Sequence, residues 1–293
     1  MRTQSMTTQS MTTEQSTARN HLLDAIGERN AQRLLAQMEL VPLPIGKVLQ
    51  EPGVVARHAY FPTTCVVSLL CGMENGSSAE IAVIGNEGVV GINAIIGGDS
   101  APNQAVVQST GYAYRIRANI LREEFQNNPE LQTLLLKYMQ ALMTQMAQTA
   151  VCNRHHTLDQ QLCRWFLNCL DRLPSNELVI TQEFIAHMLG VRREGVTGAA
   201  GKLQKAGIIN YRRGRITIID REGLEEHSCE CYDIVRKEYQ RLLPAQAHTH
   251  EAVAPRKAIN GWQSENIGNS GIGSGYVGVQ ADKKYNSGFA LRP

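Results

Sequence analysis

Residues 181–219 constrain the fold of this 293-residue chain more than any other segment, because helix, turn and hairpin signals follow one another there at short spacing. Thr181 can cap a first helix, and Gly190 can end it. The buried side of that helix would hold Ile185, Ala186 and Leu189. Two helices can cross closely through a tight turn when a small residue is followed by a glycine four positions later and an apolar residue six further on. Ala186, Gly190 and Val196 form this pattern.

A second helix is predicted from Arg193 to Ala206. At about 100° per residue, one face of this helix is apolar and the opposite face is polar. The apolar face comprises Val196, Ala199, Leu203 and Ala206, and the polar face comprises Arg193, Glu194, Thr197 and Gln204. Two β-rich runs, 208–211 and 216–219, then flank a turn that contains Gly214 and predict a hairpin. Two helices followed by such a hairpin indicate a winged helix-turn-helix.

Positive charge is concentrated in the same segment. The whole chain carries a net charge of +2, but residues 191–215 contain seven basic residues and one acid, so this window carries +6 and the remainder −4. The basic residues are Arg192, Arg193, Lys202, Lys205, Arg212, Arg213 and Arg215. A segregated positive field of this kind suits the phosphate backbone of a nucleic acid. The alternative interpretation is an ordinary solvated basic surface.

The start of the second helix carries the candidate base-reading side chains. Arg193 can donate two hydrogen bonds to guanine, and Glu194 can accept one from cytosine in the major groove. Such pairs also occur as plain surface residues, but their place at the start of a second helix favours base reading. We expect DNA contacts from Arg192, Arg193, Glu194, Thr197 and Lys202 on the helix, and phosphate contacts from Arg212, Arg213 and Arg215 on the hairpin.

Three glycines, Gly195, Gly198 and Gly201, lie within the second predicted helix. Each weakens a helix by about 1 kcal/mol relative to alanine. Gly198 and Gly201 fall on its outward side. Two interpretations stay open: the missing side chains let the helix backbone sit close to a DNA groove, or the helix is poorly optimised.

The sequence pattern from residue 41 to about residue 117 is typical of a β domain, because short apolar runs alternate with turn signals. Strands are predicted at Val66–Leu70, Glu80–Ile84, Val89–Ile92 and Ala105–Gln108. Asn75-Gly76 predicts a hairpin turn, because the central residues of a tight hairpin need positive φ. Many strands at this spacing indicate a sandwich or barrel.

Helices are predicted after Ala118. Pro129 either ends a short helix or opens the next, and a long helix continues to about residue 153, with another from Leu158 to Leu173. The apolar surface of the long helix is too broad for a single partner face. We expect one side to pack on the strand domain and the other to face a second copy of the chain through Leu135, Tyr138, Leu142 and Thr149. The alternative is an ordinary core helix.

The two ends of the chain have a different composition. Residues 1–20 are rich in Thr, Gln and Ser, and residues 244–293 are rich in Gly, Asn, Ser and Gln, so we expect both to be disordered. No segment reads as a signal peptide or a membrane span. Seven cysteines at irregular positions, without an export signal, predict a reducing cytoplasm.

Several short motifs resemble those of the Crp/Fnr superfamily, the cyclic-AMP receptor protein and its relatives, over about residues 41–243. They occur in family order and include Tyr60-Phe61-Pro62, Gly85-Asn86-Glu87-Gly88, Ile180-Thr181-Gln182 and Gly190-Val191-Arg192-Arg193-Glu194. The resemblance implies an α+β fold: an N-terminal β-roll like the cyclic-nucleotide-binding jelly roll, a long dimerisation helix and a C-terminal winged helix-turn-helix. The implied domains are 21–118 for the sensor-like β-roll, 119–153 for the dimerisation helix and 154–243 for the DNA-binding domain.

The same resemblance implies a homodimeric bacterial transcription regulator whose recognition helix, near residues 192–206, reads half of a palindrome in double-stranded DNA. RNA polymerase is a candidate partner. By this resemblance Arg193 and Glu194 match the family's base-contacting Arg-Glu pair. The family's usual arginine one turn later is Gly198 here, so one contact is missing.

The sensor departs from the family's cyclic-nucleotide pattern. Where relatives carry a glycine and a ribose-binding glutamate, this chain has Gly91-Ile92, and where they carry a phosphate-binding arginine before Ser or Thr and alanine, it has Asn103-Gln104-Ala105. Ile92 accepts no hydrogen bond, and neither Asn103 nor Gln104 supplies a cation for a buried phosphate. We therefore expect no gating by cyclic AMP, and the effector, if one exists, is unknown. No cysteine lies in residues 1–40, which argues against the iron-sulfur cluster of oxygen sensors in this family.

The sequence gives little support for a metal site, a haem site or a catalytic site. Cys229-Glu230-Cys231 beside His227 is an incomplete metal-ligand set, and His155-His156, which we place at the start of a helix, lacks nearby ligands, so no metal or cofactor is expected. Haem ligation through His58 or His21 has no positive support. No nucleophile-base pair or carboxylate pair indicates an enzyme. The alternative function is a β-roll regulatory or scaffold protein that acts through protein contacts.

Overall fold

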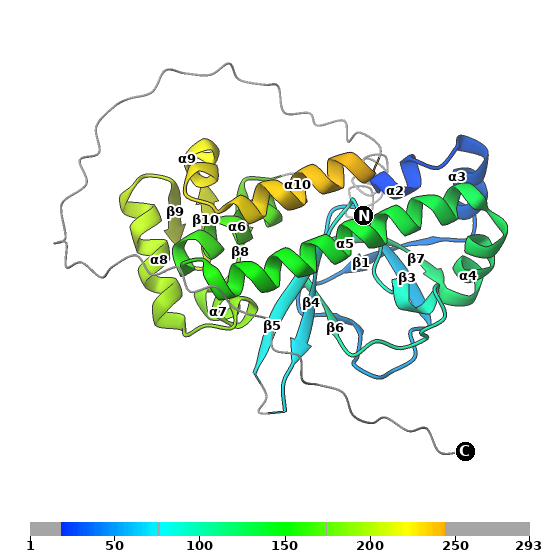
Figure 1. Cartoon of the computed structure of the whole chain (residues 1–293), viewed down its shortest axis with the longest axis horizontal. Coiled ribbons are helices and arrows are strands. Elements are labelled where there is room, and N and C mark those ends of the chain that lie inside the picture. The colour runs from blue at the N-terminus through cyan, green and yellow to red at the C-terminus, as the bar shows by residue number, and fades with distance from the viewer. Residues whose placement is uncertain (1–18, 75–76, 174, 244–293) are drawn as a thin grey trace, which may run out of the picture. The chain divides into compact units, whose positions relative to one another are not determined.

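The computed structural model describes residues 19–74, 77–173 and 175–243, and all of them belong to one of the two compact units of the chain, Met1–Ala247. The predicted α+β architecture is confirmed (Figure 1). The tails expected to be disordered lie outside the described residues, apart from Arg19 and Asn20. Asn20 caps α2 (His21–Asp24) and also donates to the carbonyls of Pro62 and Gly88, at 2.8 and 3.0 Å.

Two antiparallel sheets form the β-roll. The first has the order β1 (Glu39–Leu43), β7 (Gly111–Arg117), β3 (His58–Pro62). The second has the order β2 (Val48–Gln50), β6 (Gln104–Ser109), β4 (Val66–Gly72), β5 (Ser78–Ile84). The hairpin prediction agrees with the pairing of Gly72 with Ser78, while Asn75-Gly76 lies outside the described residues.

One predicted strand is wrong. Val89–Ile92 contributes only an isolated bridge between Val90 and Tyr60, and a 3-10 turn, η1 (Ile92–Ala94), follows. Gly91 lies between them at φ 91°, a left-handed conformation that ends an extended strand. The segment is apolar because it is buried in the core, and burial alone does not distinguish a strand from an irregular segment.

The helices predicted after Ala118 are present, with one difference in length, whereas α2 and the helix that follows it were not predicted. α3 (Glu28–Leu35) precedes the sheets, and α4 (Ala118–Asn127) follows them. Asn128 caps α5 (Pro129–His155), so Pro129 opens the long helix. α6 (Leu158–Leu170) begins at a capping box formed by Thr157 and Gln160 and ends before the predicted Leu173.

The residues expected to face a second copy do not do so. Leu135, Tyr138, Leu142 and Thr149 are all buried within the single chain. Tyr138 donates to the Val89 carbonyl at 3.2 Å, so this face of α5 packs on the β-roll. Another stripe of α5 is exposed and apolar, and its large residues are Leu136, Met143 and Val151, between 47% and 59% exposed.

The C-terminal part adds β8 (Glu177–Val179), α7 (Gln182–Leu189), α8 (Arg193–Lys205), β9 (Ile209–Arg212), β10 (Arg215–Ile218), α9 (Arg221–Glu226) and α10 (Glu230–Leu242). α10 packs along α5, as Figure 1 shows. Cys163 and Cys169 are fully buried in α6, which confirms that they serve core packing. None of the described helices is both long and apolar enough to cross a membrane.

Two buried polar contacts join the β-roll to α6 and its end. Trp165 Nε1 donates to Glu80 Oε1 at 3.0 Å, and burial raises the pKa of the Glu80 carboxyl to about 7. Arg172 Nε donates to Glu87 Oε1 at 2.8 Å, with both side chains at most 7% exposed. Gly85 makes room for this pair, because a Cβ there would lie 2.6 Å from the Arg172 side chain.

Candidate nucleic-acid interface

The helix-turn-helix has the geometry that the sequence predicts. The Thr181 side chain accepts from the Phe184 amide, and Gly190 ends α7 at φ 65°. The turn is closed by a hydrogen bond from the Val191 amide to the Ala186 carbonyl, at 3.0 Å. Ile185, Ala186 and Leu189 are buried.

α8 presents one buried and one exposed face. The buried residues are Val196, Ala199, Ala200 and Leu203. The prediction for Ala206 is wrong: it lies after the last turn of α8 as the C-cap and is exposed, whereas Ala200 takes the fourth buried position. Arg193, Glu194, Thr197 and Gln204 are all exposed.

The predicted base readers lie at the exposed N-terminal turn of α8. Arg193 Nε lies 3.9 Å from Glu183 Oε2, and both side chains are more than 60% exposed. An exposed pair at this distance contributes little free energy, so Arg193 remains able to reorient. Thr197 Oγ1 lies 2.7 Å from Gln182 Oε1, which brings the first turn of α7 beside α8.

The glycines of α8 occupy two different environments. A Cβ on Gly195 would lie 2.8 Å from the Leu158 side chain, so this glycine allows α6 and α8 to pack closely. A Cβ on Gly198 or Gly201 would meet nothing within 4 Å. Packing within the described part of the chain therefore does not require glycine at these two positions.

The wing is a tight hairpin. β9 and β10 pair antiparallel, and Arg213 and Gly214 form its turn with φ of 51° and 76°. Positive φ at both central residues is typical of a type I′ turn. β8, which was not predicted from the sequence, pairs with β10 and makes the wing a three-stranded sheet.

Acidic side chains pair with two of the residues predicted to contact DNA. Arg215 Nη1 lies 2.7 Å from Glu177 Oε1, and Lys202 Nζ lies 2.7 Å from Asp159 Oδ2. Arg192, Arg212 and Arg213 are exposed, and none forms an ion pair with a described residue. Among the described residues of this segment, the arginines without an ion pair thus lie at the N-cap of α8 and at the wing hairpin.

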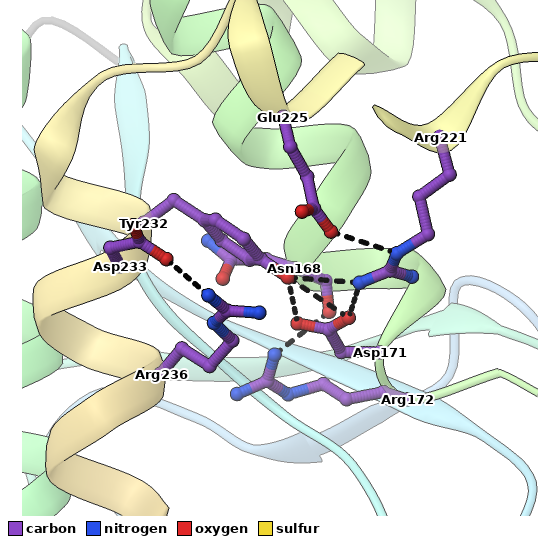
Figure 2. Close-up of polar contacts among 8 residues, drawn as sticks. All are labelled: Asn168, Asp171, Arg172, Arg221, Glu225, Tyr232, Asp233 and Arg236. Atoms are coloured by element: carbon purple, nitrogen blue, oxygen red, sulfur yellow. Dashed lines mark hydrogen bonds and ion pairs between the residues drawn. The ribbon is translucent and has the colours of Figure 1, made fainter. Parts of the chain in front are cut away.

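A polar cluster holds three helices of this part of the chain together (Figure 2). Arg221 reaches Asp171, Glu225 at 3.0 Å and the Tyr232 hydroxyl at 2.9 Å, and the Tyr232 hydroxyl also donates to Asp171. Burial raises the pKa of Tyr232, and the nearby Asp171 carboxylate raises it further. The cluster joins the end of α6 to α9 and α10. None of its residues is among those predicted to contact DNA.

Comparisons with known proteins agree with this geometry. Residues 160–227 match the family described as the Crp-like helix-turn-helix domain. The chain is similar to the Global nitrogen regulator of Synechococcus elongatus, with 23% identity over 216 residues that cover 71% of this chain and 96% of that protein.

Solved structures share the fold. FixK2 from Bradyrhizobium japonicum superposes with a TM-score of 0.57 at 15% identity, covering 66% of this chain and 98% of that one. A transcriptional regulator of the CRP/FNR family from Thermus thermophilus superposes with a TM-score of 0.53 at 22% identity, covering 65% of this chain and 98% of that one.

Proposed function

We propose that this chain, a Crp/Fnr-type DNA-binding transcription regulator and not an enzyme, binds a palindromic promoter site as a homodimer. The observation that carries the proposal is the free polar face of α8, with Arg193 and Glu194 exposed at its first turn beside a basic wing. We assign residues 21–118 to the sensor-like β-roll, 119–153 to the dimerisation helix and 154–243 to the DNA-binding domain.

Each side chain has a proposed role on DNA. Arg193 and Glu194 read neighbouring base pairs in the major groove. Arg192, Thr197 and Lys202 contact the DNA from α8, while Arg212, Arg213 and Arg215 contact phosphates from the wing. Two recognition helices related by twofold symmetry would enter successive major grooves about 34 Å apart.

The second subunit would meet the exposed apolar stripe of α5, in place of the face predicted from sequence. Leu136 and Met143 are seven residues apart and 50% and 59% exposed, and Ala147 and Ala150 continue the same stripe. Residues seven apart keep facing the same partner along two supercoiled helices. Large apolar side chains exposed along one side of a long helix favour a partner helix over solvent.

Cyclic AMP is not the proposed signal. Ile92 packs against the core of the β-roll and offers no acceptor for a ribose hydroxyl. Gln104 Nε2 donates to Glu51 Oε2 at 2.9 Å, so a carboxylate lies where the resemblance places the phosphate contact. A carboxylate disfavours an anionic ligand. The proposed setting is the bacterial cytoplasm, where DNA and RNA polymerase are present.

Gly198 supplies a test of how closely α8 approaches DNA. Because its Cβ position is open, Gly198→Ala is expected to raise the free energy of unfolding by up to about 1 kcal/mol. If the α8 backbone lies against the groove, the same change lowers DNA affinity by about tenfold or more, equivalent to roughly 1.4 kcal/mol. Thermal unfolding and DNA titration on the same preparation separate the two effects. Unchanged affinity and unchanged sequence preference would contradict close approach.

The function is tested by selecting genomic fragments with the purified full chain, followed by footprinting. We expect a single palindromic sequence with protected half-sites in successive major grooves. Recovery of fragments that share no sequence would overturn the proposal and favour a protein that acts through protein contacts.

A further inference from the structure

Four potential metal ligands from distant parts of the sequence meet where α5 ends and α10 begins. Cys152 and His156 belong to the last turn and C-cap of α5, and Cys229 and Cys231 belong to the N-cap and first turn of α10. All four ligand atoms lie within 4.8 Å of one another. His156 therefore follows α5, whereas the sequence analysis placed it at the start of a helix without nearby ligands.

Two distances between these atoms lie close to the edges of a tetrahedron around one ion, and the others are at most 4.8 Å. With Zn–S bonds of about 2.3 Å and Zn–N bonds of about 2.0 Å, tetrahedral coordination places two sulfurs roughly 3.8 Å apart and a sulfur and a nitrogen roughly 3.5 Å apart. Cys152 Sγ lies 3.5 Å from Cys229 Sγ, and Cys231 Sγ lies 3.6 Å from His156 Nδ1. A cluster of several irons would hold its thiolates farther apart.

The surroundings of His156 fix the ring in a ligating orientation. Its Nε2 lies 3.2 Å from the exposed carboxylate of Glu230, which leaves Nδ1 directed at Cys231. A carboxylate on one ring nitrogen and a metal on the other is the usual arrangement of histidine ligands. The three cysteines are at most 6% exposed, so the ligand set is closed to solvent on the sulfur side.

A buried arginine balances the charge of such a site. Three thiolates and one Zn²⁺ carry a net negative charge, and Arg164 lies close enough to act electrostatically on Cys152 and Cys231. Arg164 is 4% exposed, donates to Thr149 Oγ1 at 3.2 Å, and its Nε has no hydrogen-bond partner among the described residues. A buried cation with an incomplete set of partners favours an anionic neighbour.

We propose that Cys152, His156, Cys229 and Cys231 bind one zinc ion that joins the end of α5 to the start of α10. With four protein ligands the site has no open position, which is typical of a structural zinc site. It ties the helix assigned to dimerisation to the last helix of the DNA-binding domain. The zinc site does not depend on the proposed DNA contacts, so either can fail without the other.

Metal content of the full chain, measured by plasma mass spectrometry after exhaustive dialysis, tests the proposal. We expect about one zinc per chain in the parent and in the Cys71→Ser control, whose exposed thiol lies outside the site, and less than about a tenth in Cys229→Ser. His156→Cys is expected to retain zinc, because a fourth thiolate replaces the imidazole.

Cobalt substitution of the parent protein keeps the test independent of whether a variant folds. Co²⁺ in place of zinc is expected to give thiolate-to-cobalt charge-transfer absorption and the intense visible bands of tetrahedral coordination. The proposal would be overturned by any of three results: parent protein without metal, a disulfide between Cys152 and Cys229 in the purified chain, or iron-sulfur absorption.

Discussion

Replacing Arg172 with methionine is expected to lower the free energy of unfolding by about 3–5 kcal/mol, because it leaves the buried Glu87 carboxylate without its cation. Arg172 also donates to the Asn168 carbonyl at 2.8 Å and lies 5.9 Å from the centre of the Tyr239 ring. Urea unfolding of the full chain at neutral pH measures the change. Since the pair joins the β-roll to the end of α6, unfolding of Arg172→Met is expected to begin at this junction.

A double-mutant cycle supplies the control for this prediction. Glu87→Gln removes the charge of the partner and keeps an oxygen that can accept from the Gly85 amide. Arg172→Met combined with Glu87→Gln is expected to be more stable than Arg172→Met alone, because no uncompensated charge remains. If Arg172→Met and the double variant have equal free energies of unfolding, the ion pair does not couple the β-roll to the end of α6.

The second large effect concerns the exposed stripe of α5. Replacing Leu136 and Met143 together with glutamate is expected to convert the proposed dimer into a monomer, because four carboxylates would face one another across the proposed interface. Affinity for the two-half-site DNA is then expected to fall by about a hundredfold or more, since two linked recognition helices bind far more tightly than one. Sedimentation and DNA titration measure the two effects.

Ile234→Glu is the matched control for the stripe, because Ile234 is an exposed aliphatic residue, 41% exposed, on α10 instead of α5. It is expected to leave both the oligomeric state and DNA affinity unchanged. A dimer that survives the Leu136 and Met143 substitutions would place the interface elsewhere on the chain.

The helix-turn-helix and wing were predictable from sequence because their signals are local. Thr181, Gly190 and the Arg213-Gly214 turn each determine the backbone within a few residues. The β8 strand was missed because it is only three residues long and depends on pairing with β10, which is far away in the sequence. Short strands carry little pattern of their own.

Features that depend on tertiary packing were predicted less well. The spacing of Leu135, Tyr138 and Leu142 fits either a partner helix or the chain's own β-roll, and only the folded chain shows the latter. The motif Gly85-Asn86-Glu87-Gly88 was recognisable in the sequence, but its contacts with Arg172 and Tyr138 were not predictable from it. Cys152 and Cys229 are 77 positions apart, so local sequence patterns could not bring them together.

α8 is proposed to read bases, and the affinity of Arg193→Ala for the selected site is the most direct test of this role. The variant is expected to bind that site about 10- to 100-fold more weakly, equivalent to roughly 1–3 kcal/mol, and to lose nothing further when the contacted guanine is replaced. Arg213→Ala on the wing is expected to weaken binding equally to the selected site and to the version of that site in which the guanine is replaced. If Arg193→Ala binds the selected site as tightly as the parent, base recognition by α8 is contradicted.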